Sequence, residues 1–322
     1  MNKKILAVAV AAAFAVPAIA AADTTLFGQV KYEVGYIDVL NEDGSSDNNF
    51  VHSTKGTRLG VRGSEDLGGG ISAIFRFQGG LGGVNRGMSN TDWTMNEENW
   101  VGLRGGFGTL QFGRSDTAMK KTGGNHFRAF TDTLAEPALI PGRTARADGI
   151  HYSTPNFGGF TGFVTLEPNG VKTDTYWGLG GTYSAGPLLV TAAYEKSPDT
   201  GTFQAGTTDE SNYQVGAKYN FGQGDVGLLY QALNDGDDDV FLVPVNFKVT
   251  PQVNLRFAAK HTSPDVGDSF TNFGIGAQYN LSSRTEAFVN VWADDAVGQT
   301  SAGAGAVSDD STQLGFGLRH SF

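Results

Sequence analysis

The residues whose types and spacing could do chemistry gather in the long polar interval 115–148. Within it, Asp132 and Glu136 lie four positions apart and would share one face if the segment turns as a helix. The spacing therefore predicts that this segment presents one acidic face.

Other polar motifs do not indicate catalysis or metal binding. The acidic run 235–239 lacks the later glutamate of an EF-hand loop, so it is interpreted as a solvated loop, with surface divalent ions as the alternative. The five histidines are scattered without metal-ligand spacing. The glycine-rich stretches 80–87 and 106–113 are not part of a βαβ unit, and no G-x-S-x-G motif is present. The sequence thus predicts a non-enzymatic protein without cofactor or metal.

The elements that must position these residues are β-strands, because apolar and polar residues alternate along most of the chain. In the stretch 212–221, Tyr213 and Val215 share one face, whereas Gln214 and Lys218 share the other. The last stretch, 312–322, alternates in the same way up to the terminal Phe322. A chain end is normally loosely held, so a strand that ends on an aromatic residue indicates that this end is paired.

The connections between these strands alternate between short turns and long loops. Short turns are expected near 65–70, 105–107, 155–159, 184–187, 221–225, 249–252 and 281–284, with longer polar stretches between them. About sixteen antiparallel strands with turns at one end and loops at the other are typical of outer-membrane barrels. Because a bilayer does not tolerate open sheet edges, the sheet must close by pairing 24–39 with 312–322. The prediction is an all-β transmembrane barrel.

The start of the chain has the pattern of a secretory signal peptide. Lys3 and Lys4 precede an apolar run that is too short to span a bilayer, and small residues follow it. Cleavage after Ala22 is expected, with Ala20 as the alternative, so that 1–22 is removed and 23–322 forms one barrel domain.

Composition agrees with an exported barrel. The chain has 46 Gly and 22 Phe but no Cys, so its stability does not come from disulfides. Without the two signal-peptide lysines, 21 basic residues oppose 33 acidic ones, which gives about −12. An acidic chain of this kind argues against nucleic acid as a partner.

Several phrases of the sequence resemble the general porins of Gram-negative bacteria. They are TLFGQVKYEVG near the expected mature start, TRLGVRGSEDLGGGISAIFRFQ (57–78), VGLRGGFGTLQFGR (101–114), YSTPNFGGFTG (152–162) and the terminal LGFGLRHSF. The resemblance spans the mature chain. It implies an outer-membrane homotrimer of sixteen-stranded barrels, surrounded by lipid and lipopolysaccharide, with the third long loop folded into each pore. It also implies passive diffusion of small hydrophilic solutes and ions, and a terminal Phe322 that the barrel-assembly machinery recognises.

The same resemblance assigns the pore constriction. The stretch 131–136 is similar to the TD-x-L-x-E stretch that supplies the acidic side of the eyelet in enterobacterial porins, which implies this role for Asp132 and Glu136. The match of TRLG to the family's ARLG, of FGR to its YGR, and of the arginine entering the sixth strand implies a basic wall of Arg58, Arg114 and Arg146.

Alternation adds further residues to the basic wall and raises one conflict. It turns Arg62 and Arg76 inward together with Arg58, whereas Arg114 shares its parity with Phe112 and must follow a bulge or a strand end. Where enterobacterial porins carry a wall lysine this chain has Gln29, and Lys31 is the next inward position. The alternative for each arginine is a solvated lumen charge without a specific role.

Three alternatives to a general porin remain. The first is an outer-membrane channel for one class of solute. The second is a barrel-based hydrolase, but the histidines at 126, 151 and 261 lack a convincing nucleophile. The third is a soluble secreted β-protein. For a general porin, a basic waist behind acidic outer loops predicts little charge discrimination or a slight preference for anions.

Overall fold

The computed structural model describes residues 23–40, 45–81, 84–85, 93–95, 97–139, 141, 146–168, 175–197, 210–294 and 311–322. The predicted signal peptide and its cleavage site at Ala20 or Ala22 precede these residues. In the described part of the chain, no helix is both long and apolar enough to cross a membrane. Nearly all of this part is one antiparallel sheet.

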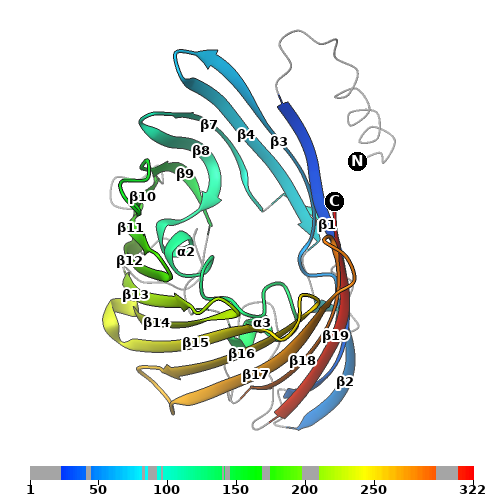
Figure 1. Ribbon diagram of the computed structural model, residues 1–322. Helices are drawn as coiled ribbons and strands as arrows, with labels where there is room; N and C mark the ends of the chain where they lie inside the picture. The colour runs from blue at the N-terminus through cyan, green and yellow to red at the C-terminus, as the bar shows by residue number, and fades with distance from the viewer. Residues whose placement is uncertain are drawn as a thin grey trace.

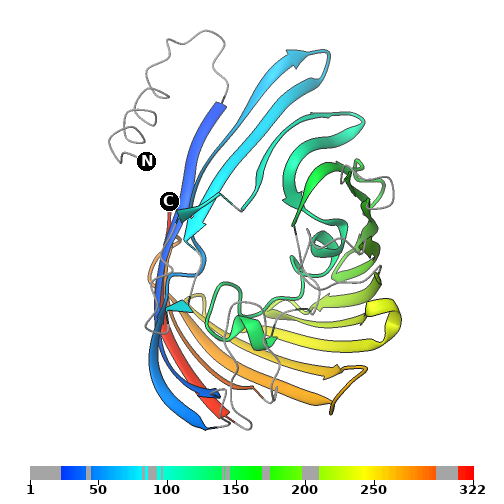
Figure 2. The same cartoon turned by 180° about the vertical axis from the view of Figure 1, so that it is seen from behind.

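The sheet curls into a barrel around an open lumen (Figures 1 and 2). Its strands are β1 (Asp23–Leu40), β2 (Ser46–Ser53), β3 (Thr57–Gly68), β4 (Ile71–Leu81), β5 (Val84–Asn85), β6 (Trp93–Thr94), β7 (Asn99–Gly105), β8 (Gly108–Asp116), β9 (Arg146–Ser153), β10 (Phe160–Glu167), β11 (Tyr176–Ala185), β12 (Leu188–Ser197), β13 (Glu210–Asn220), β14 (Gly224–Leu233), β15 (Asp238–Lys248), β16 (Val253–Ser263), β17 (Phe270–Asn280), β18 (Thr285–Asp294) and β19 (Ser311–Ser321). A short 3₁₀ turn, η1 (Asn234–Gly236), joins β14 to β15.

These nineteen segments occupy sixteen strand positions around the barrel wall. We term each position a stave, because some of them contain two segments. Both β2 and β3 pair with β1, while β5 pairs with β2 and β4 pairs with β3, so β2 with β3 and β4 with β5 are the halves of two staves. Likewise β6 and β7 both pair with β4 and form one stave. The predicted number of strands is therefore confirmed, and the extra segments arise where three staves are interrupted.

The barrel closes between the two ends of the chain. β1 and β19 pair antiparallel from Gln29↔Ser321 to Tyr36↔Leu314. The last residue completes the sheet, because Phe322 N donates to Gly28 O and Gly28 N donates to Phe322 O, both at 3.0 Å. The prediction that the terminal strand is paired is thus confirmed. Figure 1 shows this end of the chain beside β1.

The two faces of the sheet follow the predicted alternation. On the outer face, Val101 and Ile275 are 58% and 59% exposed. On the inner face, Gln231 and Asn290 are fully buried. An apolar outer face and a polar inner face are what a barrel in a bilayer requires. The terminal strand follows the same rule, with Phe316 exposed and Gln313 buried.

The chain between β8 and β9 lies inside the barrel rather than above it (Figures 1 and 2). It contains two short helices, α2 (Ala118–Thr122) and α3 (Glu136–Leu139). α2 contacts β10, β11 and β12, whereas α3 contacts β16 and β17. The predicted inward fold of the third long loop is confirmed for its described residues, 117–139 and 141.

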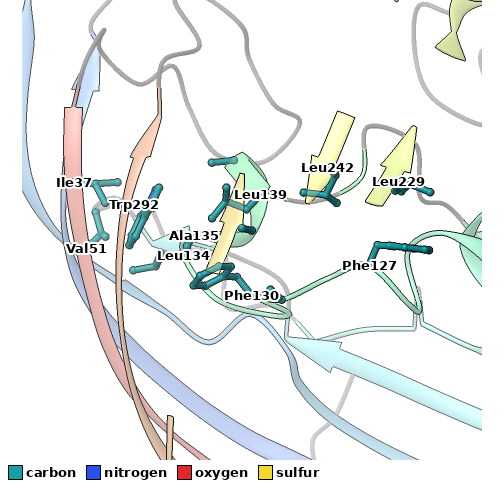
Figure 3. Packing of buried hydrophobic residues seen from close by; sticks show 13 residues of the cluster. Ile37, Val51, Phe127, Phe130, Leu134, Ala135, Leu139, Leu229, Leu242 and Trp292 are labelled. Carbon is teal, nitrogen blue, oxygen red and sulfur yellow. The ribbon is translucent and has the colours of Figure 1, made fainter. Parts of the chain in front are cut away.

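A hydrophobic cluster seals this inner loop against the wall (Figure 3). Phe130 is 1% exposed and Leu139 is also 1% exposed. On the wall, the buried partners include Leu229, Leu242 and Trp292, which point into the barrel although the inner face is mostly polar. The burial of apolar area here gives the loop a fixed position in the lumen.

Polar wall side chains hold the backbone of the same loop. Each donates a hydrogen bond to a carbonyl oxygen of the loop's irregular backbone. These bonds run from Gln214 Nε2 to Met119 O at 2.7 Å, Lys218 Nζ to His126 O at 3.1 Å, Arg256 Nη1 to Ala129 O at 3.3 Å, Arg319 Nη2 to Thr131 O at 3.0 Å and Asn272 Nδ2 to Ala138 O at 3.1 Å.

Candidate functional site

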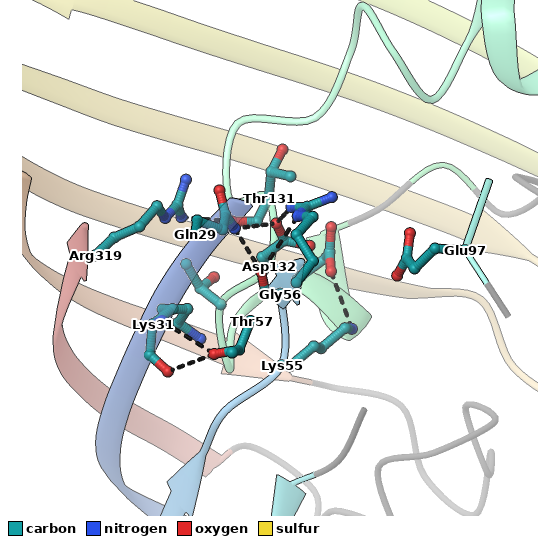
Figure 4. Close-up of polar contacts among 12 residues, drawn as sticks. Gln29, Lys31, Lys55, Gly56, Thr57, Glu97, Thr131, Asp132 and Arg319 are labelled. Atoms are coloured by element: carbon teal, nitrogen blue, oxygen red, sulfur yellow. Dashed lines mark hydrogen bonds and ion pairs between the residues drawn. The ribbon is translucent and has the colours of Figure 1, made fainter. Parts of the chain in front are cut away.

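An interruption in the second stave creates a platform for the inner loop. β1 pairs with β3 up to Gln29 and with β2 from Glu33 onward, so residues 54–56 leave the sheet between them. Thr57 Oγ1 takes the place of a backbone partner for Lys31, because it donates to Lys31 O and accepts from Lys31 N, both at 3.0 Å. Gly56 has φ +89°, a value that disfavours side-chain-bearing residues. The bulge carries Lys55 toward the inner loop (Figure 4).

Five charged residues meet where the inner loop touches this bulge, and we term them the loop-anchor cluster: Lys55, Arg58, Arg128, Asp132 and Glu136. Arg58 pairs with Asp132, and Arg128 pairs with Glu136. Lys55 Nζ lies 2.9 Å from Glu136 Oε2. The two predicted carboxylates are therefore not free, because both are bound to cations of the wall or of the loop itself.

The position of Asp132 depends on close contact with the bulge. A Cβ atom at Gly56 would lie 2.5 Å from Asp132 Cβ, so only glycine leaves room for this approach. Gln29 Nε2 donates to Gly56 O at 2.6 Å and to Asp132 Oδ2 at 3.3 Å, and it thereby joins the bulge to the loop (Figure 4). Asp132 itself has φ +61°, in the left-handed region that Asp and Asn tolerate better than most residues.

The charge state of Asp132 is set by two opposing effects. Burial raises the pKa of its carboxyl group, but the guanidinium groups of Arg58 and Arg128 outweigh burial and hold the pKa below its ordinary value. Asp132 is therefore ionised at neutral pH, and its ion pair with Arg58 persists well into the acidic range.

The structure corrects the predicted role of Lys31. Its Nζ atom lies 2.7 Å from Glu33 Oε2, and both side chains are 0% exposed. The inner loop covers this pair, since Leu134 N donates to Glu33 Oε2 at 2.9 Å. Lys31 faces inward as predicted, but it supports the loop from beneath and contributes no exposed charge to the wall.

Arg146 belongs to a second group of charges, where the inner loop leaves β8 and returns to β9. Arg146 Nη2 lies 2.8 Å from Glu97 Oε2, and Arg146 Nε lies 3.0 Å from Asp116 Oδ1. Lys120 Nζ lies 2.9 Å from the same Asp116 oxygen. Arg146 is therefore brought to the base of the loop, where it is paired, and not to the loop-anchor cluster.

Arg76 faces inward and is also paired. Its Nη1 atom lies 2.7 Å from Glu98 Oε2. The prediction of an inward Arg76 agrees with the register, but Glu97 and Glu98 reduce the net positive charge of this part of the wall.

The structure also corrects the placement of Arg114. Arg114 remains in register with Asp148 in the β8–β9 ladder, on the same parity as Phe112. Its Nη1 atom lies 2.9 Å from Asp148 Oδ2, and the Asp148 side chain is 62% exposed. The ladder has no bulge here that would turn Arg114 toward the lumen. Arg114 therefore pairs with Asp148 and belongs to neither group of inner charges.

Arg62 faces inward but lies away from the loop-anchor cluster, toward the short-turn end of the barrel. It pairs across the sheet with Arg76, and both guanidinium groups lie over the Phe27 ring, at 5.1 and 4.9 Å from its centroid. Among the described residues, Arg62 has no ion-pair partner.

Two members of the loop-anchor cluster were not predicted for the site, namely Lys55 and Arg128. The sequence gives no clear signal for Lys55, because it lies at the boundary between a polar stretch and the strand that begins at Thr57. Arg128 lies four residues before Asp132, which lies four residues before Glu136, but only the folded loop brings Arg128 to Glu136. Among the described residues, no group of three or more His, Cys, Asp or Glu side chains could hold a metal ion.

Together, these features define a transmembrane barrel with a water-facing interior that an inward loop narrows. The charged side chains of this interior line the wall and the inner loop, and most of them form ion pairs.

Comparison with known proteins identifies the family. The family model described as Gram-negative porin matches residues 7–299, so the chain belongs to the Gram-negative porins. Outer membrane porin protein 32 of Delftia acidovorans is 30% identical over 362 residues, and major outer membrane protein P.IB of Neisseria lactamica is 28% identical over 355 residues. In both cases all of each chain is covered.

A solved structure has the same fold. The anion-selective porin from Comamonas acidovorans superposes with a TM-score of 0.74 at 24% sequence identity, covering 94% of this chain and 100% of that one. The protein is therefore an outer-membrane channel of a Gram-negative bacterium and not an enzyme. The predicted fold, location and general function are confirmed, and the hydrolase and soluble-protein alternatives are excluded.

Proposed function

We propose that this porin is a general diffusion channel for small hydrophilic solutes and ions, with a slight preference for anions. The observation that carries this proposal is the charge balance of the inner surface. Three basic residues oppose two carboxylates in the loop-anchor cluster, and both carboxylates are ion-paired. A modest positive excess attracts anions weakly and leaves neutral solutes unaffected.

The constriction in this proposal lies between the inner loop and the wall of β3, β4 and β7. Asp132 and Glu136 form its acidic side, as the sequence predicts, and Arg58 with Lys55 forms the adjoining basic side. Arg76 and Arg146 extend the basic wall at a distance from the loop-anchor cluster, each with an acidic partner. Because most of these charges are paired, their combined field is weaker than that of separated acidic and basic walls.

The proposal includes three kinds of partner. We infer a homotrimer, which is typical of the family, in contact with lipid and lipopolysaccharide. The apolar outer face supports the lipid contact. Phe322 supports recognition by the barrel-assembly machinery, since its side chain is 44% exposed on the outer face while its backbone closes the sheet.

Reconstitution in a planar bilayer tests the proposal. Purified folded protein should produce stepwise conductance, in groups of three if the trimer inserts as a unit. The reversal potential in a KCl gradient should have the sign of weak anion preference and should change toward stronger anion preference in Glu136→Gln. Folded protein without conductance would refute the channel, whereas a strong preference for cations would refute the proposed charge balance.

A channel for one class of solute is the alternative. The same bilayer measurement separates the two, because a general pore conducts small organic anions and cations in proportion to their mobility. A pore specific for one class would conduct that class well beyond its mobility.

A further inference from the structure

A second group of arginines lies near the short-turn end of the lumen, away from the inner loop. There β1, β3, β4 and β7 surround a pocket of about 380 Å³. Arg62, Arg76 and Arg104 line it, together with Trp100. Asp23 contributes the single carboxylate among the lining residues. This volume is within the range of small-molecule sites.

The two central arginines are held together by the sheet. Arg62 and Arg76 are directly opposite in the β3–β4 ladder, an arrangement of like charges that is unfavourable on its own. Both guanidinium groups lie over the Phe27 ring, which provides a cation–π contact to each. Phe27 can occupy this place because Gly60 has no side chain: a Cβ atom there would lie 2.6 Å from Phe27 Cζ.

The charges of this pocket are only partly neutralised within the protein. Glu98 binds Arg76, whereas neither Arg62 nor Arg104 forms an ion pair with a described residue. Both Arg62 and Arg104 are exposed to the lumen. The pocket therefore offers two available guanidinium groups, each able to bind a carboxylate through two parallel hydrogen bonds.

Trp100 supplies an independent sign of a missing partner. Its indole Nε1 atom is buried and has no hydrogen-bond partner among the described residues. A buried N–H without an acceptor is costly, and such groups usually bind a ligand or water. Ile74 lines the same pocket and gives it an apolar surface beside the polar donors.

We propose that this pocket is a binding subsite for small dicarboxylates on their way through the channel. The two carboxylates would bind Arg62 and Arg104, the Trp100 N–H would donate to one of their oxygens, and the short carbon chain would contact Ile74. A single inorganic oxyanion would leave most of the volume empty. The inference rests on the proposed channel function and adds a preferred class of solute to it.

Block of chloride current by succinate in single-channel recordings tests the subsite. Succinate should lower the KCl conductance in a saturable way, whereas acetate at the same ionic strength should not. Arg62→Gln should raise the half-blocking concentration about tenfold, the effect expected for loss of one charged hydrogen-bonding partner. Arg284→Gln is the matched control, because Arg284 is exposed in the turn between β17 and β18 at the same end of the barrel, and it should leave the block unchanged.

Trp100→Phe separates binding from folding, since it retains an aromatic ring and removes only the N–H donor. It should weaken the succinate block while conductance in KCl and acetate stays the same. A conducting wild-type channel without saturable block, an equal block by sulfate, or equal effects of Arg62→Gln and Arg284→Gln would overturn the subsite. A wild-type protein that does not conduct at all would instead overturn the proposed function.

Discussion

Neutralising Asp132 gives the most direct test of the constriction. Asp132→Asn removes one negative charge, keeps the size of the side chain and retains a residue type that tolerates φ +61°. The substitution thereby leaves Arg58 without its carboxylate partner. The constriction becomes more positive by one unit charge, so selectivity should change toward anions.

The size of this change can be worked out from Coulomb's law. The Asp132 side chain is only 12% exposed, so the dielectric constant of bulk water gives the lower limit of its effect on a passing ion. At a distance of about 8 Å in water, one unit charge changes the energy of the ion by about 0.5 kcal/mol, and salt near 0.1 M reduces this to about 0.2 kcal/mol. Because anions are favoured as much as cations are disfavoured, the ratio of anion to cation permeability should rise about two- to fivefold.

The assay is the reversal potential of single channels in a KCl gradient at two ionic strengths. Asp235→Asn is the matched control, since Asp235 also has positive φ, at +62°, but lies in the exposed turn η1. The control should leave the reversal potential near the wild-type value. An unchanged reversal potential in Asp132→Asn, or an equal change in both variants, would refute the placement of Asp132 in the constriction.

Three further predictions concern how the loop and the barrel are held. Gly56→Ala should displace the loop from the bulge, because its methyl group would overlap Asp132, and frequent partial closures in single-channel recordings should reveal this; a quiet trace would contradict it. Since the pKa of Asp132 is lowered in the folded protein, its contribution to loop docking is complete above the ordinary carboxyl pKa and is lost as pH falls through the lowered value. Current noise should therefore rise only in strong acid, and Asp132→Asn should show that noise already at neutral pH. Removal of Phe322 deletes two backbone hydrogen bonds of the closing seam and should reduce the yield of heat-modifiable folded protein on gels, with Phe322→Tyr as the conservative control.

The sequence determined the barrel and the orientation of most side chains. Alternation is a property of neighbouring residues, because successive side chains of a strand point to opposite faces. It therefore put Val215 and Gln214 on opposite faces, which the structure shows as the outer and the inner face, and it correctly turned Arg58, Arg62 and Arg76 inward. The aromatic end of the chain likewise indicated the closing strand pair.

Only the tertiary structure decided which charges meet. Arg58 pairs with a carboxylate 74 residues away, and a bulge that alternation does not reveal brings Lys55 to Glu136. Lys31 has the correct parity, yet the loop buries it with Glu33. The direction of a side chain follows from its own strand. Its partner and its exposure depend on which distant segment packs over it, and the local sequence does not specify that segment.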